Sequence, residues 1–401
     1  MILPVYLDNS ATTPCDTRVV EAMLPFFTEN FGNPASRFHL YGWEAEDAVD
    51  NARARIAGLI GAKPAEIVFT SGATESCNLA IKGVFESFKD DRKHIITLHT
   101  EHKAVLETVG YLRKKGCEVT VLGVNNMGMP DLDELERAIR PSTGLIAIMY
   151  ANNETGVIHP IRDIASIARK HGVLLFSDAT QAVGKIPVNV AGDGLDMMAF
   201  TAHKIYGPKG VGALYIRSKN PSIRISAQLS GGYHERGFRS GTLNVPGIVG
   251  FGVAAQLARH EMESEALRLL GQRNQLEEKL LGLSGVYLNG DPANRLPHVT
   301  NISIDRVESE RLLLDISSKL ALGTGSACSS ATQEPSHVLK AMGISAELLP
   351  CSVRISQGRF TTSEQVDVAA DILQKAIIRL RAGQLSVPNN PLRLSSFSVL
   401  P

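Results

Sequence analysis

Lys204 is the residue with the clearest chemical potential in this sequence. It follows residues 197–200, an apolar stretch with the pattern of a short buried strand, and precedes a glycine-rich segment at 206–210. Burying an ammonium group is costly unless its pKa falls or its charge is consumed. Forming an imine with a carbonyl cofactor consumes the charge, and pyridoxal phosphate (PLP) is the best known such cofactor for a lysine. For an arbitrary lysine, a surface position at a strand end is the commoner alternative.

Asp178 provides the second half of this pattern. It comes directly after the apolar strand predicted at 173–176. An aspartate at the end of such a strand needs a partner, and a protonated pyridine nitrogen is one that takes part in chemistry. Asp178 precedes Lys204 by 26 residues, and each ends a predicted strand. This order of acid and lysine is typical of fold-type I PLP enzymes.

Two more polar clusters follow predicted strands, where a parallel sheet binds its ligands. Residues 70–75 form a glycine-containing turn into a helix, and the backbone N–H groups there suit a phosphate. An ordinary helix cap is the alternative for that turn. His102 lies at the start of the next helix. A histidine there can be a cap or a satisfied core group, or it can stack on a ring cofactor.

Three residues further along are candidates for handling a substrate. Asn153 lies in a loop after a strand, where its amide could bind a substrate, although such a loop is often only a turn. Arg354 lies inside a short strand and could be a surface residue, but a buried guanidinium suits a two-point grip on a carboxylate. Cys328 lies in the small-residue loop 323–330. A free cysteine is usually buried and inert, whereas exposure in a flexible loop favours a nucleophile.

The elements that would position these residues alternate regularly. Apolar strands are predicted at 66–70, 94–98, 117–122, 145–150 and 173–176, and helices at 16–28, 44–60, 73–85, 102–115, 131–139 and 161–171. Strands that are apolar throughout and separated by helices indicate a mostly parallel sheet covered on both faces. We therefore expect an α/β fold.

The C-terminal part has a different pattern. A long helix is predicted from Pro246 to about Leu281, followed by strands at 298–304 and 352–356 and helices at 309–319 and 363–381. This is a small α+β unit. We expect a large α/β domain at 15–258, and a small domain formed by 1–14 and 259–401 that carries the Cys328 loop.

Composition excludes several classes of protein. The 401 residues carry 41 basic and 41 acidic side chains, without a basic stripe for nucleic acid. The longest apolar runs are too short to cross a membrane, and the N-terminus has no signal shape. Five cysteines are scattered through the chain, which argues against a disulfide framework or a paired-cysteine metal site. A reducing, cytoplasmic setting is expected.

Together these segments resemble the cysteine desulfurases of the NifS/IscS type, within the class-V aminotransferase family of fold-type I PLP enzymes. The Ser-Ala-Cys-Ser loop is similar to that of the first of their two subgroups. The matching segments cover nearly the whole chain: Tyr6-Leu7-Asp8, Ala11-Thr12-Thr13-Pro14, Phe31-Gly32-Asn33-Pro34, Thr70-Ser71-Gly72-Ala73-Thr74-Glu75, Glu101-His102, Asn152-Asn153-Glu154, Asp178-Ala179, His203-Lys204, Arg239-Ser240-Gly241-Thr242, Gly325-Ser326-Ala327-Cys328 and Gly358-Arg359-Phe360-Thr361-Thr362.

The resemblance implies a role for each matching residue. Lys204 would bind PLP covalently, Asp178 would pair with the pyridine nitrogen, Gln181 would bond the ring hydroxyl and His102 would stack on the ring. Asn153 and Arg354 would hold the carboxylate of L-cysteine. The remaining residues would bind the phosphate: Ala73, Thr74, Thr201, His203 and, from the other subunit of a homodimer, Thr242.

The resemblance also implies a reaction. Cysteine would displace Lys204, the freed amine would remove the Cα proton, and the Cys328 thiolate would attack the substrate sulfur. The products would be L-alanine and a persulfide on Cys328. We expect this sulfur to pass to an acceptor such as an iron–sulfur scaffold protein.

Two departures and two alternatives accompany this interpretation. Tyr233 stands where the family usually has glycine, and Cys77 where asparagine is common; Cys77 could be an extra oxidisable thiol. One alternative is another PLP enzyme of the same fold, such as a selenocysteine lyase or an aminotransferase-like protein. The other is a non-catalytic relative that only binds partners, since fold alone does not fix activity.

Overall fold

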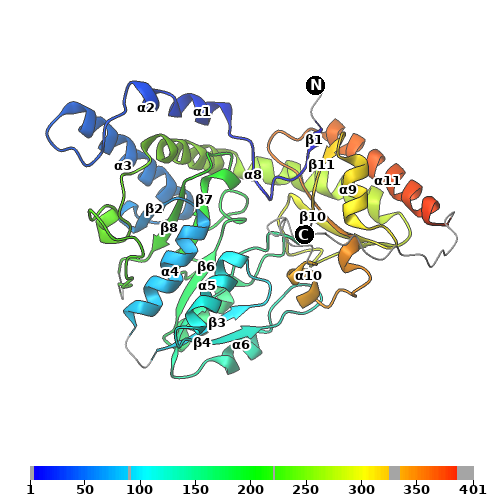
Figure 1. Cartoon of the computed structure of the whole chain (residues 1–401), viewed down its shortest axis with the longest axis horizontal. Coiled ribbons are helices and arrows are strands. Elements are labelled where there is room, and N and C mark those ends of the chain that lie inside the picture. Colours follow the sequence, from blue (N-terminus) through cyan, green and yellow to red (C-terminus); the bar gives the residue numbers. More distant parts are fainter. Residues whose placement is uncertain (1–3, 89–91, 220–221, 325–334, 386–401) are drawn as a thin grey trace, which may run out of the picture.

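A seven-stranded sheet forms the centre of the larger part of the molecule. The computed structural model describes residues 4–88, 92–219, 222–324 and 335–385 (Figure 1). The sheet has the strand order β2 (Ile67–Thr70), β8 (Gly212–Ile216), β7 (Met197–Thr201), β6 (Leu174–Asp178), β5 (Thr143–Ala147), β3 (His94–Leu98) and β4 (Glu118–Leu122). β8 alone runs opposite to the other six strands. The predicted α/β fold is confirmed.

Both faces of this sheet are buried, as the apolar strands predicted. On one face, α4 (Ala73–Ser87) and α5 (Lys103–Arg113) pack on alternate strand residues. On the other face the core contains side chains of α3 (Leu40–Ile60), α6 (Leu132–Ala138), α7 (Ile161–Lys170) and α8 (Val245–Leu281). Because side chains alternate along each strand, the same strands supply both cores with successive residues.

A second, antiparallel sheet organises the smaller part. Its order is β12 (Gly323–Thr324), β13 (Ser352–Ser356), β10 (Val299–Ile304) and β9 (Val286–Leu288). A separate hydrophobic cluster contains side chains of this sheet, of α9 (Ser309–Ile316) and of α11 (Ser363–Leu385), together with Leu7. β1 (Val5–Tyr6) pairs with β11 (Leu320–Ala321), so the N-terminal segment lies against the C-terminal part (Figure 1). The short helix α10 (His337–Ala341) lies between β12 and β13 in the sequence.

Several short elements, among them β9, β12 and α10, were not predicted, and two larger differences have a clear cause. The helix predicted at 16–28 is two helices, α1 (Thr17–Met23) and α2 (Pro25–Thr28), because Pro25 has no N–H to continue the first one. The strand β8 was not predicted, because it follows β7 through a turn and so interrupts the alternation of strands and helices.

The long helix α8 connects the two parts (Figure 1). Its first half packs closely on α3, where a Cβ atom added at Gly252 would lie 2.6 Å from Ala52 Cα. Its last turns place Leu276 and Leu280 in the core of the smaller part. One continuous helix therefore takes part in both cores.

We predict opposite effects for two alanine substitutions in α8. Gly252→Ala should lower the free energy of unfolding by about 1–3 kcal/mol, because its methyl group meets the α3 backbone. Gly271→Ala is the matched control, since a Cβ there meets nothing within 4 Å. It should raise stability by about 0.5–1 kcal/mol through helix propensity. Thermal unfolding of both variants checks this, and a higher melting temperature for Gly252→Ala would contradict the close packing.

Candidate active site

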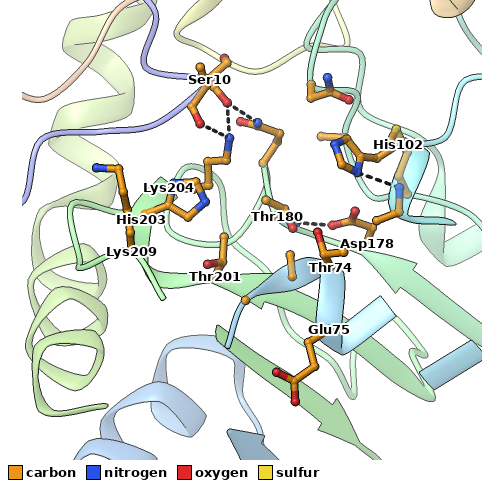
Figure 2. Close-up of a pocket in the computed structure, with 18 of the residues that line it drawn as sticks. Ser10, Thr74, Glu75, His102, Asp178, Thr180, Thr201, His203, Lys204 and Lys209 are labelled. Carbon is orange, nitrogen blue, oxygen red and sulfur yellow. Dashed lines mark hydrogen bonds between the residues drawn. The ribbon is translucent and has the colours of Figure 1, made fainter. Parts of the chain in front are cut away.

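The carboxyl ends of the parallel strands open into one cavity of about 540 Å³ (Figure 2). Segments after β2, β3, β5, β6 and β7 line it, and the smaller part contributes Arg354 from β13. The lining includes most of the predicted site residues: Ala73, Thr74, His102, Asn153, Asp178, Gln181, Thr201, His203, Lys204 and Arg354. The sequence pattern thus located the residues that the fold brings together.

Lys204 enters the cavity from the 3₁₀ turn Ala202–Lys204 that directly follows β7. Its Nζ donates to the carbonyl oxygens of Ser10 at 2.5 Å and Ala11 at 2.6 Å (Figure 2). Charge-assisted hydrogen bonds of this kind stabilise an ammonium away from bulk water. The lysine is therefore not a surface side chain at a strand end, and the N-terminal segment helps to hold it.

Asp178 is the last residue of β6 and is buried. Its Oδ1 accepts a hydrogen bond from the Thr180 backbone N–H at 3.0 Å (Figure 2). Its Oδ2 accepts from the thiol of Cys77, with a sulfur–oxygen distance of 3.8 Å. Each carboxylate oxygen has two lone pairs. The carboxylate is therefore held in place and still has acceptor capacity for a group in the cavity.

The N-terminus of α4 provides an anion-binding end of the cavity. Its first residue, Ala73, lines the cavity beside Thr74, and no side chain caps the helix at Gly72. The uncapped N–H groups and the helix dipole favour a negative group there. The pKa of His203 falls to about 4 because the ring is buried, with Lys204 and other positive charge nearby. A neutral His203 ring can still bind an anionic group through a hydrogen bond. Its Nδ1 lies 3.0 Å from the Thr12 hydroxyl.

His102 caps the helix that it precedes. Its Nδ1 accepts a hydrogen bond from the Ala104 backbone N–H at 3.1 Å, and its ring lines the cavity near Asp178 (Figure 2). The capping alternative and the cofactor-stacking hypothesis are thus compatible, since one ring nitrogen caps while the ring faces the cavity. Gln181 also lines the cavity, and its Nε2 donates to Ser10 O at 2.9 Å.

Arg354 is 1% exposed, which excludes the surface alternative. Its Nη1 donates to the Asn153 carbonyl at 3.0 Å, and its Nη2 donates to Asp8 Oδ1 at 2.8 Å. Among the described residues its buried Nε has no hydrogen-bond partner. A guanidinium that lines a cavity and is held by two hydrogen bonds suits a carboxylate ligand.

Two predicted residues are not among those that line the cavity. Thr242 is exposed, which agrees with its expected contact with another subunit but does not test it. The neighbouring Arg239 donates from Nε to Glu75 Oε1 at 2.8 Å, which fixes this segment beside the start of α4. Cys328 lies outside the described residues.

The structure reveals three contributions that sequence reasoning missed. The carbonyl groups of Ser10 and Ala11 hold Lys204, although Ala11 was noted only as part of a resembling segment and Ser10 lies outside the segments noted. Glu101 is buried, accepts from the Met149 N–H at 2.7 Å, and has a pKa raised well above its usual value by burial. Its only sequence signal was its place before His102.

Cys77 does not fit the expectation of an oxidisable thiol. Its side chain is fully buried on α4. Burial and the nearby acids Asp178 and Glu101 raise the pKa of the Cys77 thiol well above its usual value. Oxidation requires an accessible thiolate, and this environment opposes both access and ionisation.

Neither a helix able to span a membrane nor a cluster of metal-ligating side chains occurs in the described part of the chain. No helix there is long and apolar enough to cross a membrane. No group of three or more histidine, cysteine, aspartate or glutamate side chains there could hold a metal ion.

Comparison with known proteins agrees with this geometry. Residues 5–368 match the family "Aminotransferase class-V". The chain is 53% identical over 383 residues to "Cysteine desulfurase IscS" of Salmonella schwarzengrund, which covers 95% of this chain and 94% of the relative. Its fold matches the solved structure "NIFS-LIKE PROTEIN", with a TM-score of 0.88, 38% identity and coverage of 95% of this chain and 100% of the other. It also matches "SspA in complex with cysteine", with a TM-score of 0.78, 37% identity and coverage of 89% and 100%. The chain therefore belongs to the PLP-dependent class-V aminotransferase family and, within it, to the cysteine desulfurases.

Proposed function

We propose that this cysteine desulfurase moves the sulfur of L-cysteine onto Cys328 as a persulfide and releases L-alanine. The sulfur then passes to an acceptor protein, such as an iron–sulfur scaffold, in the cytoplasm. The observation that carries this proposal is the placement of Lys204, Asp178 and Arg354 around one cavity. An amine, a carboxylate and a carboxylate-binding guanidinium are the groups that an amino acid and PLP together require.

The cavity fits PLP in its donor set. Asp178 provides a held carboxylate for the ring nitrogen, Lys204 an amine for the aldehyde, and the uncapped start of α4 a phosphate site. The Thr180 hydroxyl is buried at the cavity wall without a hydrogen-bond partner among the described residues, as expected of a polar lining. When bound, PLP supplies an aldehyde that bonds amines and a ring that accepts electron density from Cα.

Arg354 and Asn153 define the substrate end. The Arg354 guanidinium lines the cavity, and its hydrogen bonds to Asn153 O and Asp8 orient it toward a carboxylate of cysteine; Asn153 lies on the same wall. The solved relative "SspA in complex with cysteine" is a protein of the same fold with this amino acid bound. This similarity supports cysteine as the substrate.

Lys204 is the proposed base for the Cα proton. Once its Nζ carries that proton, the carbonyl groups of Ser10 and Ala11 can stabilise the charge through the hydrogen bonds already present. His102 stacks beside the reacting groups. Because its Nδ1 accepts from Ala104 N–H, the neutral ring carries its proton on Nε2.

Both described flanks of the segment that contains Cys328 lie beside the site. Gly323 is paired with Arg354 in the small sheet, and a Cβ added there would lie 2.7 Å from Asp8 Oδ1. On the other side, the Ser336 hydroxyl donates to Glu154 Oε2 at 2.5 Å. These anchors support a Cys328 thiol that reaches the substrate sulfur.

A homodimer is the proposed assembly. Large apolar side chains are exposed between α2 and the start of α3, where the rings of Phe31 and Tyr41 are in contact at 5.3 Å. Exposed apolar groups gathered in this way mark an interaction surface on a protein. We define the apolar face as Leu24, Phe27, Phe31, Phe38, Leu40, Tyr41 and Trp43. The exposed Thr242 would then reach the phosphate end of the partner subunit.

We also propose that the two hydrophobic cores correspond to two domains, with the boundaries expected from the sequence. The large domain would comprise residues 15–258, and the small domain residues 1–14 and 259–401. Leu7 and the last turns of α8 share the core of the smaller part, which supports this division.

Two substitutions separate the cofactor role from the sulfur role. Cys328→Ser should retain the visible absorption of bound PLP but lose sulfide release by at least about 100-fold, because no thiolate is left to attack. Lys204→Ala should lose the absorption itself. Cys351→Ser, a buried cysteine outside the cavity lining, is the matched control and should behave as the unmodified protein. Sulfide release with reductant from Cys328→Ser at the unmodified rate would reject the persulfide route.

Charge on the apolar face should weaken the dimer. Phe38 is 94% exposed, so Phe38→Glu should fold normally yet sediment with more monomer. Its affinity for PLP should also fall, since Thr242 of the other subunit is lost. Leu314→Glu, at a residue 70% exposed on α9, is the control. An equal sedimentation of both variants as dimers would place the interface elsewhere.

Stability should depend on pH through Glu154. Burial raises the pKa of Glu154 to about 7, although Ser336 and Arg354 oppose the shift. The folded state then holds the proton more tightly than the unfolded chain, so stability is present below the ordinary pKa and is lost as pH rises through about 7. Glu154→Gln should therefore gain up to about 3 kcal/mol over the unmodified protein between pH 5 and pH 8.

Urea unfolding at several pH values measures this difference. Glu263→Gln, which changes an exposed carboxylate on α8, should follow the unmodified protein at every pH. A constant difference for Glu154→Gln across the range would show that this carboxyl group titrates normally.

A further inference from the structure

Cys77 contacts the residue proposed to hold the ring nitrogen of PLP. Helix α4 packs against β6 and directs this side chain at the end of that strand. Its Sγ lies 3.8 Å from Asp178 Oδ2 and has no solvent exposure. The other carboxylate oxygen is bonded to the Thr180 backbone N–H. The thiol is therefore the side-chain donor to Asp178 in the described structure.

The direction of this hydrogen bond follows from burial. Desolvation and the neighbouring acids keep the pKa of the Cys77 thiol well above its usual value, so the sulfur keeps its proton. A thiol is a weak donor, and a carboxylate is a strong acceptor. The S–H group therefore donates, and Asp178 accepts.

Charged and titratable groups approach Asp178 from several elements. The junction of β3 and α5 contributes Glu101 and His102, the segment after β7 contributes Lys204, and β13 contributes Arg354 across the cavity. His203 and Lys209 line the same cavity. Burial, with the charge of Asp178, raises the pKa of Glu101 well above its usual value. Burial therefore favours the neutral form of Glu101, and Asp178 is the carboxylate that the Cys77 thiol contacts.

We propose that Cys77 is a positioning residue that, by donating to Asp178 Oδ2, sets how strongly the ring nitrogen of PLP holds its proton. This inference rests on the proposed pairing of Asp178 with that nitrogen. A donor on the carboxylate disperses its negative charge and so reduces its attraction for a protonated ring. A stronger donor at position 77 should release the ring proton more easily, and loss of the donor should hold it more tightly.

The test uses the full-length protein loaded with PLP labelled with ¹⁵N at the ring nitrogen. Cys77→Ser supplies a stronger donor, whereas Cys77→Val keeps a similar size without one. In ¹⁵N NMR titrations, the pH at which the ring nitrogen loses its proton should fall in Cys77→Ser and rise in Cys77→Val. Each shift should be about half to one pH unit. The dissociation constant of PLP should change about threefold to tenfold, upward for serine and downward for valine.

Opposite signs distinguish this role from a structural one, since a loosened site would move both variants in the same direction. Cys117→Ala is the matched control, because this buried thiol precedes the edge strand β4, whereas Asp178 ends the central strand β6. It should leave the titration unchanged.

Asp178→Asn distinguishes a failure of the proposed pairing between Asp178 and the ring nitrogen from a failure of the proposed role of Cys77. If it displaces the titration while both Cys77 variants leave it unchanged or move it in one direction, the role of Cys77 is wrong and the pairing of Asp178 stands. If Asp178→Asn itself leaves the titration unchanged, the pairing fails and the inference fails with it. A shift in Asp178→Asn with opposite shifts in the two Cys77 variants supports both.

Discussion

The hydrogen bonds between Lys204 Nζ and the carbonyl groups of Ser10 and Ala11 are the interaction on which the site depends. They stabilise a half-buried ammonium group at the end of β7 without using a carboxylate for it. Asp178, on the neighbouring strand, can therefore serve another cation. A direct ion pair between the two side chains would have consumed both groups.

The N-terminal segment reaches Lys204 because it is anchored on the C-terminal part. β1 pairs with β11, and the chain then passes the cavity at Ser10 before it joins α1. The same segment places Asp8 against Arg354 at 2.8 Å. One stretch of chain thus supplies the acceptors for the lysine of the large sheet and for the arginine of the small one. This segment therefore contacts both the lysine end and the arginine end of the cavity.

The sequence predicted much of this site because polar residues followed apolar strands. The ends of parallel strands meet at one edge, so Thr74, His102, Asp178 and Lys204 had to converge once the strands were recognised. The carbonyl groups that hold Lys204 could not be predicted in the same way, because every residue has a carbonyl and no side-chain type marks it. β8 was missed for a related reason, since an antiparallel hairpin leaves no intervening helix to signal it.

The two buried acids Asp178 and Glu101 differ in the donors that meet them. Two fixed donors, the Thr180 backbone N–H and the Cys77 thiol, meet the oxygens of Asp178. Glu101 meets one backbone N–H, and burial raises its pKa well above its usual value. Two ionised carboxylates so close together in a buried site would repel each other strongly. Burial favours the protonated forms of Glu101 and Cys77, the two groups beside Asp178. A protonated ring nitrogen would pair with Asp178, and the donors already on that carboxylate would affect how strongly the ring attracts electron density from a bound substrate.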